Sequence, residues 1–382
     1  MTRAYLDHAS TSPLRPTVLA AMLPFLSDNF GDPGRLHQEG HFTRVAVETA
    51  REQVAVLFGA HPREVVFTAT GTESVNAAIW GATNRSFAEP QGKSHIVTSQ
   101  VESSCVLDAC ARSGYEITAV GVDNCGRFLV EEVIGAFQPE TVFLTLQLAN
   151  HEVGTIQSAI PEILAVAKER GILTHVDARA AAGHLKLDFA DLGADLCSIT
   201  ADTWGGPLGS AALLIKRGLR ISPLLVGGMQ ERARRGGSEN VAAIVGFGSA
   251  ANEIWAGDQL DIEARLARQY TDQIIAGSLA LPGVQQLGDP KQRLPHLVCI
   301  AVNDVESEPI LLGLDQHGVA VHSGSSCSSE ALEPSPVLTA MGVDADKSLR
   351  VSSGWSTTKK DIDTFLTEFP LVLNRLRELR NG

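Results

Sequence analysis

The chain lacks any run of 18 or more apolar residues, so the sequence predicts no membrane-spanning helix. An acidic residue, Asp7, lies where a signal peptide would have its apolar core, which favours a cytoplasmic protein. The six cysteines show none of the paired spacings of zinc sites, redox motifs or disulfide frameworks. We therefore expect reduced thiols and no metal site.

Basic residues are also scarce. The 382 residues include 31 Lys and Arg against 44 Asp and Glu, which gives a formal net charge of −13. Such a surface is not built to neutralise phosphates. The sequence therefore predicts no direct binding of nucleic acid, although an acidic protein can still dock a basic partner.

Short β-rich runs alternate with helical patterns through the first 220 residues. Continuous apolar runs, such as 142–145 and 211–215, are separated by amphipathic stretches such as 43–58 and 161–170. This alternation predicts an α/β fold with a mostly parallel sheet that is covered on both faces. In such sheets the ligand site lies at the carboxyl ends of the strands.

The pattern changes at about Asp261, where a long helical segment leads into a strand at 297–301, a glycine- and serine-rich loop and a terminal helix. We predict a large α/β domain over residues 14–258. A small α+β domain would be formed by residues 1–13 and 259–382. The chain contains no internal repeats or low-complexity tracts.

Two segments place polar groups where strands end. Residues 70–74, Thr-Gly-Thr-Glu-Ser, follow a strand and open a helix, so their N–H groups and hydroxyls could cradle a phosphate or simply cap the helix. Asp177 ends a strand and could pair with a cationic ring nitrogen or cap the following turn. The sequence alone leaves both alternatives open.

Three further positions could carry chemistry. Cys327 lies in a small polar loop, where a thiol could attack or carry sulfur once deprotonated, or lie idle at the surface. Arg350 could grip a carboxylate in two-pronged fashion or form a structural ion pair. Residues 234–240 form a basic turn that could reach an anionic ligand or a neighbouring subunit, or be a solvated charge cluster.

Taken in order, these segments resemble the cysteine desulfurases of the class V aminotransferase family. The resemblance covers nearly the whole chain, and its last motif is similar to the long-loop subgroup that serves iron–sulfur assembly. Its main motifs are at residues 67–74, 150–155, 175–178, 227–232 and 323–335. The resemblance implies the pyridoxal-phosphate-dependent transferase type I fold and a homodimer with shared active sites.

The resemblance also assigns roles to single residues. Thr72 and the partner subunit's Ser238 would hold the cofactor phosphate, and Asp177 the pyridine nitrogen. Arg350 would hold the substrate carboxylate, and Cys327 would take sulfur from cysteine to become a persulfide. The remaining positions that would lie in the cofactor pocket are Gly71, His151, Thr200 and Thr203.

The chain departs from the family where the cofactor would lie. The family's Ser-Gly-His-Lys reads Thr-Ala-Asp-Thr here, so Thr203 replaces the Schiff-base lysine and Asp202 a histidine beside the phosphate. Ser103 replaces a stacking histidine, Ala180 a glutamine and His151 an asparagine. A threonine hydroxyl cannot form a Schiff base, and a carboxylate beside a phosphate dianion is repelled. These changes predict a pocket that is no longer adapted to pyridoxal phosphate.

Three functions follow from these observations. The favoured one is a desulfurase-like protein of sulfur transfer or iron–sulfur cluster assembly, without pyridoxal-phosphate chemistry, in which Cys327 carries a persulfide or acts as a ligand. Its partner would be a sulfur acceptor or an iron–sulfur scaffold protein. The alternatives are an active desulfurase with non-covalently bound cofactor, and a non-catalytic scaffold or regulator.

Overall fold

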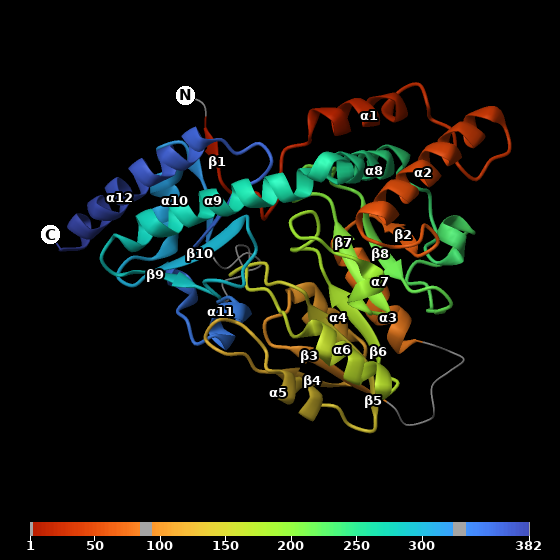
Figure 1. The fold of residues 1–382 in the computed structure, drawn as a ribbon, viewed down its shortest axis with the longest axis horizontal. Coiled ribbons are helices and arrows are strands. Elements are labelled where there is room, and N and C mark those ends of the chain that lie inside the picture. The colour runs from red at the N-terminus through yellow and green to blue at the C-terminus, as the bar shows by residue number, and fades with distance from the viewer. Residues whose placement is uncertain (1–2, 85–93, 324–333, 382) are drawn as a thin grey trace.

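The computed structural model describes residues 3–84, 94–323 and 334–381 (Figure 1). Its largest sheet has seven strands in the order β2-β8-β7-β6-β5-β3-β4. These strands are β2 (Val65–Thr68), β3 (His95–Ser99), β4 (Glu116–Val120), β5 (Thr141–Gln147), β6 (Leu173–Asp177), β7 (Leu196–Thr200) and β8 (Ala211–Ile215). Strand β8 is antiparallel to both neighbours, and the other neighbouring pairs are parallel. The mostly parallel sheet predicted from the sequence is therefore confirmed.

Helices cover both faces of this sheet, which explains why most of its strands are buried along their whole length. On one face α2, α6 and α8 pack through residues such as Val54, Leu164 and Phe247. On the other face α3 and α4 pack through Ile79 and Val106. The helices are α1 (Pro16–Leu26), α2 (Gln38–Leu57), α3 (Gly71–Thr83), α4 (Ser104–Arg112), α5 (Val130–Gly135), α6 (Ile160–Glu169), α7 (Phe189–Leu192) and α8 (Val241–Trp255).

A second sheet of four antiparallel strands has the order β12-β13-β10-β9. Its strands are β9 (Val284–Leu287), β10 (Leu297–Val302), β12 (His322–Ser323) and β13 (Ser348–Ser352). The accompanying helices are α9 (Gln259–Leu279), α10 (Ser307–Gln316), α11 (Pro336–Ala340) and α12 (Lys359–Asn381). Helices α9, α10 and α12 share one apolar core with this sheet, centred on Ile300, Val351 and Phe365.

The N-terminal strand β1 (Ala4–Tyr5) pairs in parallel with β11 (Val319–Ala320), and Leu6 lies in the core of the four-stranded sheet. The N-terminus thus contacts the C-terminal part of the chain, as expected. The domain boundaries at 13/14 and 258/259 stay a prediction. Helix α9 begins at Gln259 and extends from α8 to the second sheet (Figure 1).

The described cysteines are free thiols, and three of them are fully buried within apolar cores: Cys110, Cys197 and Cys299. Burial raises the pKa of the Cys110 thiol to about 12, so this group is inert at neutral pH. Cys327 lies outside the described residues. Among the described helices, none combines the length and the apolar character that crossing a membrane requires.

Candidate functional site

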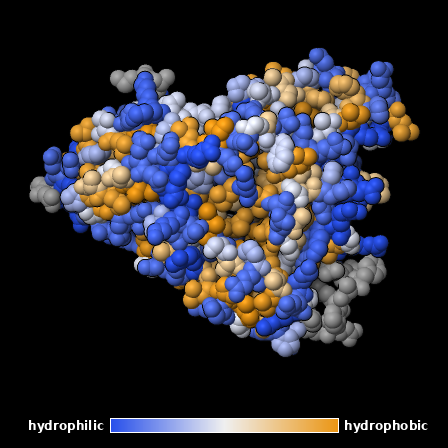
Figure 2. Space-filling model, in the orientation of Figure 1, coloured by the Kyte–Doolittle hydropathy of each residue, from blue (hydrophilic) through white to orange (hydrophobic). Residues whose placement is uncertain are grey.

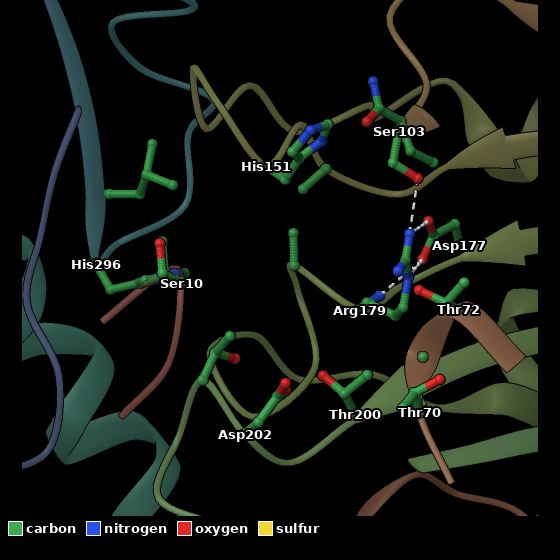
Figure 3. Close-up of a pocket in the computed structure, with 17 residues that line it drawn as sticks. Ser10, Thr70, Thr72, Ser103, His151, Asp177, Arg179, Thr200, Asp202 and His296 are labelled. Atoms are coloured by element: carbon green, nitrogen blue, oxygen red, sulfur yellow. Dashed lines mark hydrogen bonds and ion pairs between the residues drawn. The ribbon is translucent and has the colours of Figure 1, made fainter. Parts of the chain in front are cut away.

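A cavity of about 270 Å³ opens where β5, β6 and β7 end and α3 begins (Figure 3). Gln147, Asp177 and Thr200 are the last residues of these three strands, and all of them line the cavity. Residues from the N-terminal segment and from the start of β10 close the opposite side. The cavity therefore lies at the strand ends, where the sequence placed the ligand site.

The start of α3 forms one wall of the cavity. The Thr70 hydroxyl accepts a hydrogen bond from the Glu73 backbone N–H at 3.0 Å, so this segment does cap its helix. Gly71 and Thr72 line the cavity itself. A side chain at Gly71 would not fit, because its Cβ would lie 2.5 Å from the Arg179 Cδ and 2.6 Å from the Thr200 Cγ2.

Asp177 is bound by an arginine of its own chain (Figure 3). The Arg179 Nε donates to one carboxylate oxygen at 2.8 Å and the Nη2 to the other at 2.6 Å. The same Nη2 donates to the Ser103 hydroxyl at 2.7 Å and lies 3.1 Å from the Cys105 sulfur. Both oxygens of Asp177 are thus engaged inside the cavity by one guanidinium group.

The ion pair also sets the charges of both groups. Burial of Asp177 opposes ionisation, but the charge and hydrogen bonds of Arg179 outweigh it, and the pKa of the carboxyl is lowered. Burial likewise opposes the charge on Arg179, and the Asp177 carboxylate outweighs it so that the pKa of the guanidinium is raised. The pair is therefore fully ionised near neutral pH and contributes no net charge to the cavity.

Hydrogen bonds and ring packing hold the segment after β7, which lines the cavity through Asp202 and Thr203. The Trp204 indole N–H donates to the Thr200 carbonyl at 2.7 Å, and its ring packs against Phe58. The Ser12 hydroxyl donates to the Thr203 carbonyl at 2.7 Å. One carboxylate oxygen of Asp202 and the Thr203 hydroxyl are nevertheless buried without a hydrogen-bond partner among the described residues.

His151 lines the cavity. Burial, with the positive charges of Arg350 and Arg179, lowers the pKa of its imidazole to about 4. His296 also lines the cavity, and it stacks on His184 with ring centroids 3.4 Å apart. Burial lowers the pKa of His296 well below its usual value, so both cavity histidines are neutral at pH 7.

Arg350 is almost completely buried in β13 and does not line the cavity. Its guanidinium donates to the Ser10 hydroxyl at 2.6 Å, to the Asp7 carboxylate at 3.1 Å and to the His151 carbonyl at 3.1 Å. The structure therefore contains the ion pair that the sequence offered as one alternative for this residue. Its predicted contact with a substrate carboxylate stays a prediction.

Of the cofactor-binding residues predicted within one chain, Gly71, Thr72, His151, Asp177, Thr200 and Thr203 lie together around the cavity. Ser238 is exposed within the basic turn and does not line the cavity. In that turn Arg235 pairs with Glu73 of α3 at 2.8 Å. The contribution of Ser238 to a partner subunit stays a prediction.

Sequence reasoning missed Arg179, the residue with the most polar contacts in the cavity. The available signal was an arginine two positions after a carboxylate that ends a buried strand. A side chain so placed follows the turn after the strand and can fold back over the sheet rim. His296 was missed because the residue that it stacks on, His184, is distant in sequence.

Comparison with known proteins places this geometry in a family. The family model for class-V aminotransferases matches residues 4–365. The chain is 39% identical to a cysteine desulfurase IscS of Methanosarcina thermophila, over 98% of this chain and 93% of the relative. It is 40% identical to a cysteine desulfurase IscS of Dictyoglomus turgidum, over 98% and 95%.

A solved structure supports the same family assignment. A NifS-like protein superposes with a TM-score of 0.89 at 29% identity, covering 98% of this chain and 100% of the other. These matches confirm the resemblance and the fold predicted from the sequence. The chain belongs to the class-V aminotransferase family, in which its curated relatives are cysteine desulfurases.

Proposed function

We propose that this chain is a sulfur-transfer protein, derived from a cysteine desulfurase, that works without pyridoxal-phosphate chemistry and carries sulfur as a persulfide on Cys327. Its relatives are named cysteine desulfurases, which supports the sulfur chemistry. Its partners would be a sulfur donor and a sulfur acceptor or iron–sulfur scaffold protein.

The lining of the cavity does not fit pyridoxal phosphate. The described lining residues include no lysine, and Thr203 offers a hydroxyl where the family has the amine. Lys186 pairs with Asp261 at 2.7 Å and Lys216 with Asp195 at 3.0 Å, both outside this cavity. We therefore derive no chemical step through the cofactor.

The observation that carries the proposal is the ion pair between Asp177 and Arg179. In the family the matching carboxylate would hold the pyridine nitrogen. Here a guanidinium already occupies both of its oxygens, at 2.6 and 2.8 Å. A cofactor would have to separate this buried pair, whereas the protein without cofactor leaves it intact.

Described residues on both sides of residues 324–333 contact residues close to the cavity. Before this range, β12 pairs with β13 next to Arg350. After it, the Ser335 hydroxyl donates to the Glu152 carboxylate at 2.5 Å, and Glu152 directly follows the cavity residue His151. The proposal that Cys327 acts at this site is supported by these contacts of the flanking residues.

The proposed step is a transfer between thiols. The Cys327 thiolate attacks the outer sulfur of a persulfide on a donor protein. A new sulfur–sulfur bond forms on Cys327 as the donor's bond breaks, and the donor leaves as a thiolate. The step needs no oxidant, no reductant and no cofactor on this chain.

The test combines two measurements on the full chain. With added pyridoxal phosphate and cysteine, we expect no absorbance band of a lysine-linked cofactor and no sulfide release. With a persulfidated desulfurase as donor, we expect mass spectrometry to place one extra sulfur atom on Cys327, and Cys327→Ser to lose it. Steady sulfide release, or equal loading of the serine variant, would refute the proposal.

The homodimer belongs to the same proposal. Exposed apolar side chains gather on α1 and the segment that follows it (Figure 2), including Leu23, Leu26 and Phe30. Val226 and Met229, which precede the turn with Ser238, are also about four-fifths exposed. Apolar exposure on this scale marks an interaction surface, and a second copy of the chain would cover it.

A further inference from the structure

The charges lining the cavity leave one carboxylate uncompensated. Asp177 and Arg179 neutralise each other at 2.6 Å, and the two histidines of the lining are neutral at pH 7. The remaining ionisable side chain among the described lining residues is the carboxyl group of Asp202. Among the described residues, this carboxylate has no ion-pair partner, and one of its oxygens accepts no hydrogen bond.

Several polar atoms around the cavity also lack partners. Besides the Asp202 and Thr203 oxygens, the Gln147 amide nitrogen and the His296 Nδ1 have no hydrogen bond among the described residues. Gln147 and His296 are each only 2% exposed. Unpaired buried polar atoms are unfavourable, so a ligand that supplies the missing hydrogen bonds would bind in preference to an apolar one.

From this arrangement we propose that the cavity binds a small organic cation whose ammonium group lies against Asp202. The inference rests on the proposed function, because it requires the cavity to be free of pyridoxal phosphate. Figure 3 shows the Asp202 carboxylate and the Thr200 hydroxyl facing one another on one side of the cavity. An ammonium group has three donors and no acceptor, which suits a carboxylate flanked by hydroxyls.

The volume of the cavity and its other polar lining residues limit which cations would fit. A volume of about 270 Å³ equals roughly nine water molecules, which admits a primary amine of a few non-hydrogen atoms. Gln147 and Ser103, which also line the cavity, are neutral and polar, so they suit a hydroxyl or amide group of the ligand. An anion gains less, because Arg179, the only cationic group among the described lining residues, is already paired with Asp177.

The test uses ethanolamine as the cation probe, with acetate and inorganic phosphate as anion probes. Isothermal titration of the full chain should show saturable millimolar binding of ethanolamine and none of either anion. Asp202→Asn should weaken ethanolamine binding about 10- to 100-fold, as expected for one charged hydrogen bond. Asp258→Asn removes the same charge at an exposed site away from this cavity and should bind like the wild type.

The outcomes are distinguishable. Absence of ethanolamine binding, tighter binding of phosphate, or unchanged binding by Asp202→Asn would overturn the inference. If that variant does not fold, the comparison of cation and anion binding by the wild-type protein still tests the inference. Sulfur loading of Cys327 is measured separately, so a persulfide without ethanolamine binding would refute this inference and leave the proposed function standing.

Discussion

Restoring a lysine at position 203 should not be enough to restore cofactor binding, because Arg179 would still occupy the Asp177 carboxylate. That carboxylate is 6% exposed and held by two hydrogen bonds of 2.8 and 2.6 Å. Breaking a buried pair of this kind costs about 3–5 kcal/mol. At about 1.4 kcal/mol per tenfold change, this corresponds to a factor of roughly 10² to 10⁴ in cofactor affinity.

The experiment compares Thr203→Lys with the double variant that also has Arg179→Ala. We expect the double variant to bind pyridoxal phosphate at least about 100-fold more tightly, by the same conversion. Binding is followed by the absorbance of the lysine-linked cofactor and, after borohydride reduction, by its mass on the peptide that contains position 203. Adding Asp202→His to both proteins removes the like charge equally, so their ratio still reports on Arg179 alone.

Folding must be controlled, because Arg179→Ala leaves Asp177 buried without its cation. The free energy of unfolding of each variant is therefore measured in urea. Arg179→Lys is the matched control, since an ammonium keeps the charge but cannot make the two-pronged contact. If Thr203→Lys and the folded double variant bound the cofactor equally well, the claim that Arg179 prevents cofactor binding would be refuted.

Three further results are expected. Leu23→Glu should turn a dimer into a monomer in light scattering while Leu312→Glu, equally exposed on α10, should not; a dimeric Leu23→Glu protein would exclude the α1 surface. Gly71→Ala should lower the free energy of unfolding by about 1–3 kcal/mol through overpacking against the Arg179 side chain, whereas Gly135→Ala, with open space around it, should not. Burial lowers the pKa of His184 to about 3 from 6.5, so its stabilising contribution is complete above pH 6.5 and is lost as the pH falls towards 3. His184→Phe should therefore reduce the loss of stability between pH 8 and 5 by about 2 kcal/mol, and an unchanged pH profile would contradict this.

The local patterns of the sequence predicted much of the fold. The apolar runs at 142–145 and 211–215 lie within β5 and β8, and the helical segment at 161–170 matches α6 to within one residue. These elements are readable because their burial is continuous or periodic. Strand β4 has no such continuous pattern, because it pairs at the edge of the sheet and leaves Glu116 and Ala119 exposed.

The location of the site was also predictable, but its internal contacts were not. Asp177 and Thr200 end neighbouring strands, so their shared position at the sheet rim follows from the fold. The direction of the Arg179 side chain depends on the turn after β6. The bond between Arg350 and Ser10 joins residues 340 positions apart, and no local pattern specifies such a pair.

The departures from the family pattern are physically coupled in this structure. Arg179 can lie on Asp177 partly because Ser103 accepts its remaining hydrogen bond at 2.7 Å. A histidine at position 103 would remove that hydroxyl, and a lysine at position 203 would bring a second cation towards the pair. Reverting one residue therefore leaves a buried charge or donor unsatisfied, which makes the effects of reversion non-additive. The altered cavity is then a stable arrangement of its own, from which cofactor binding is regained only by changing several residues together.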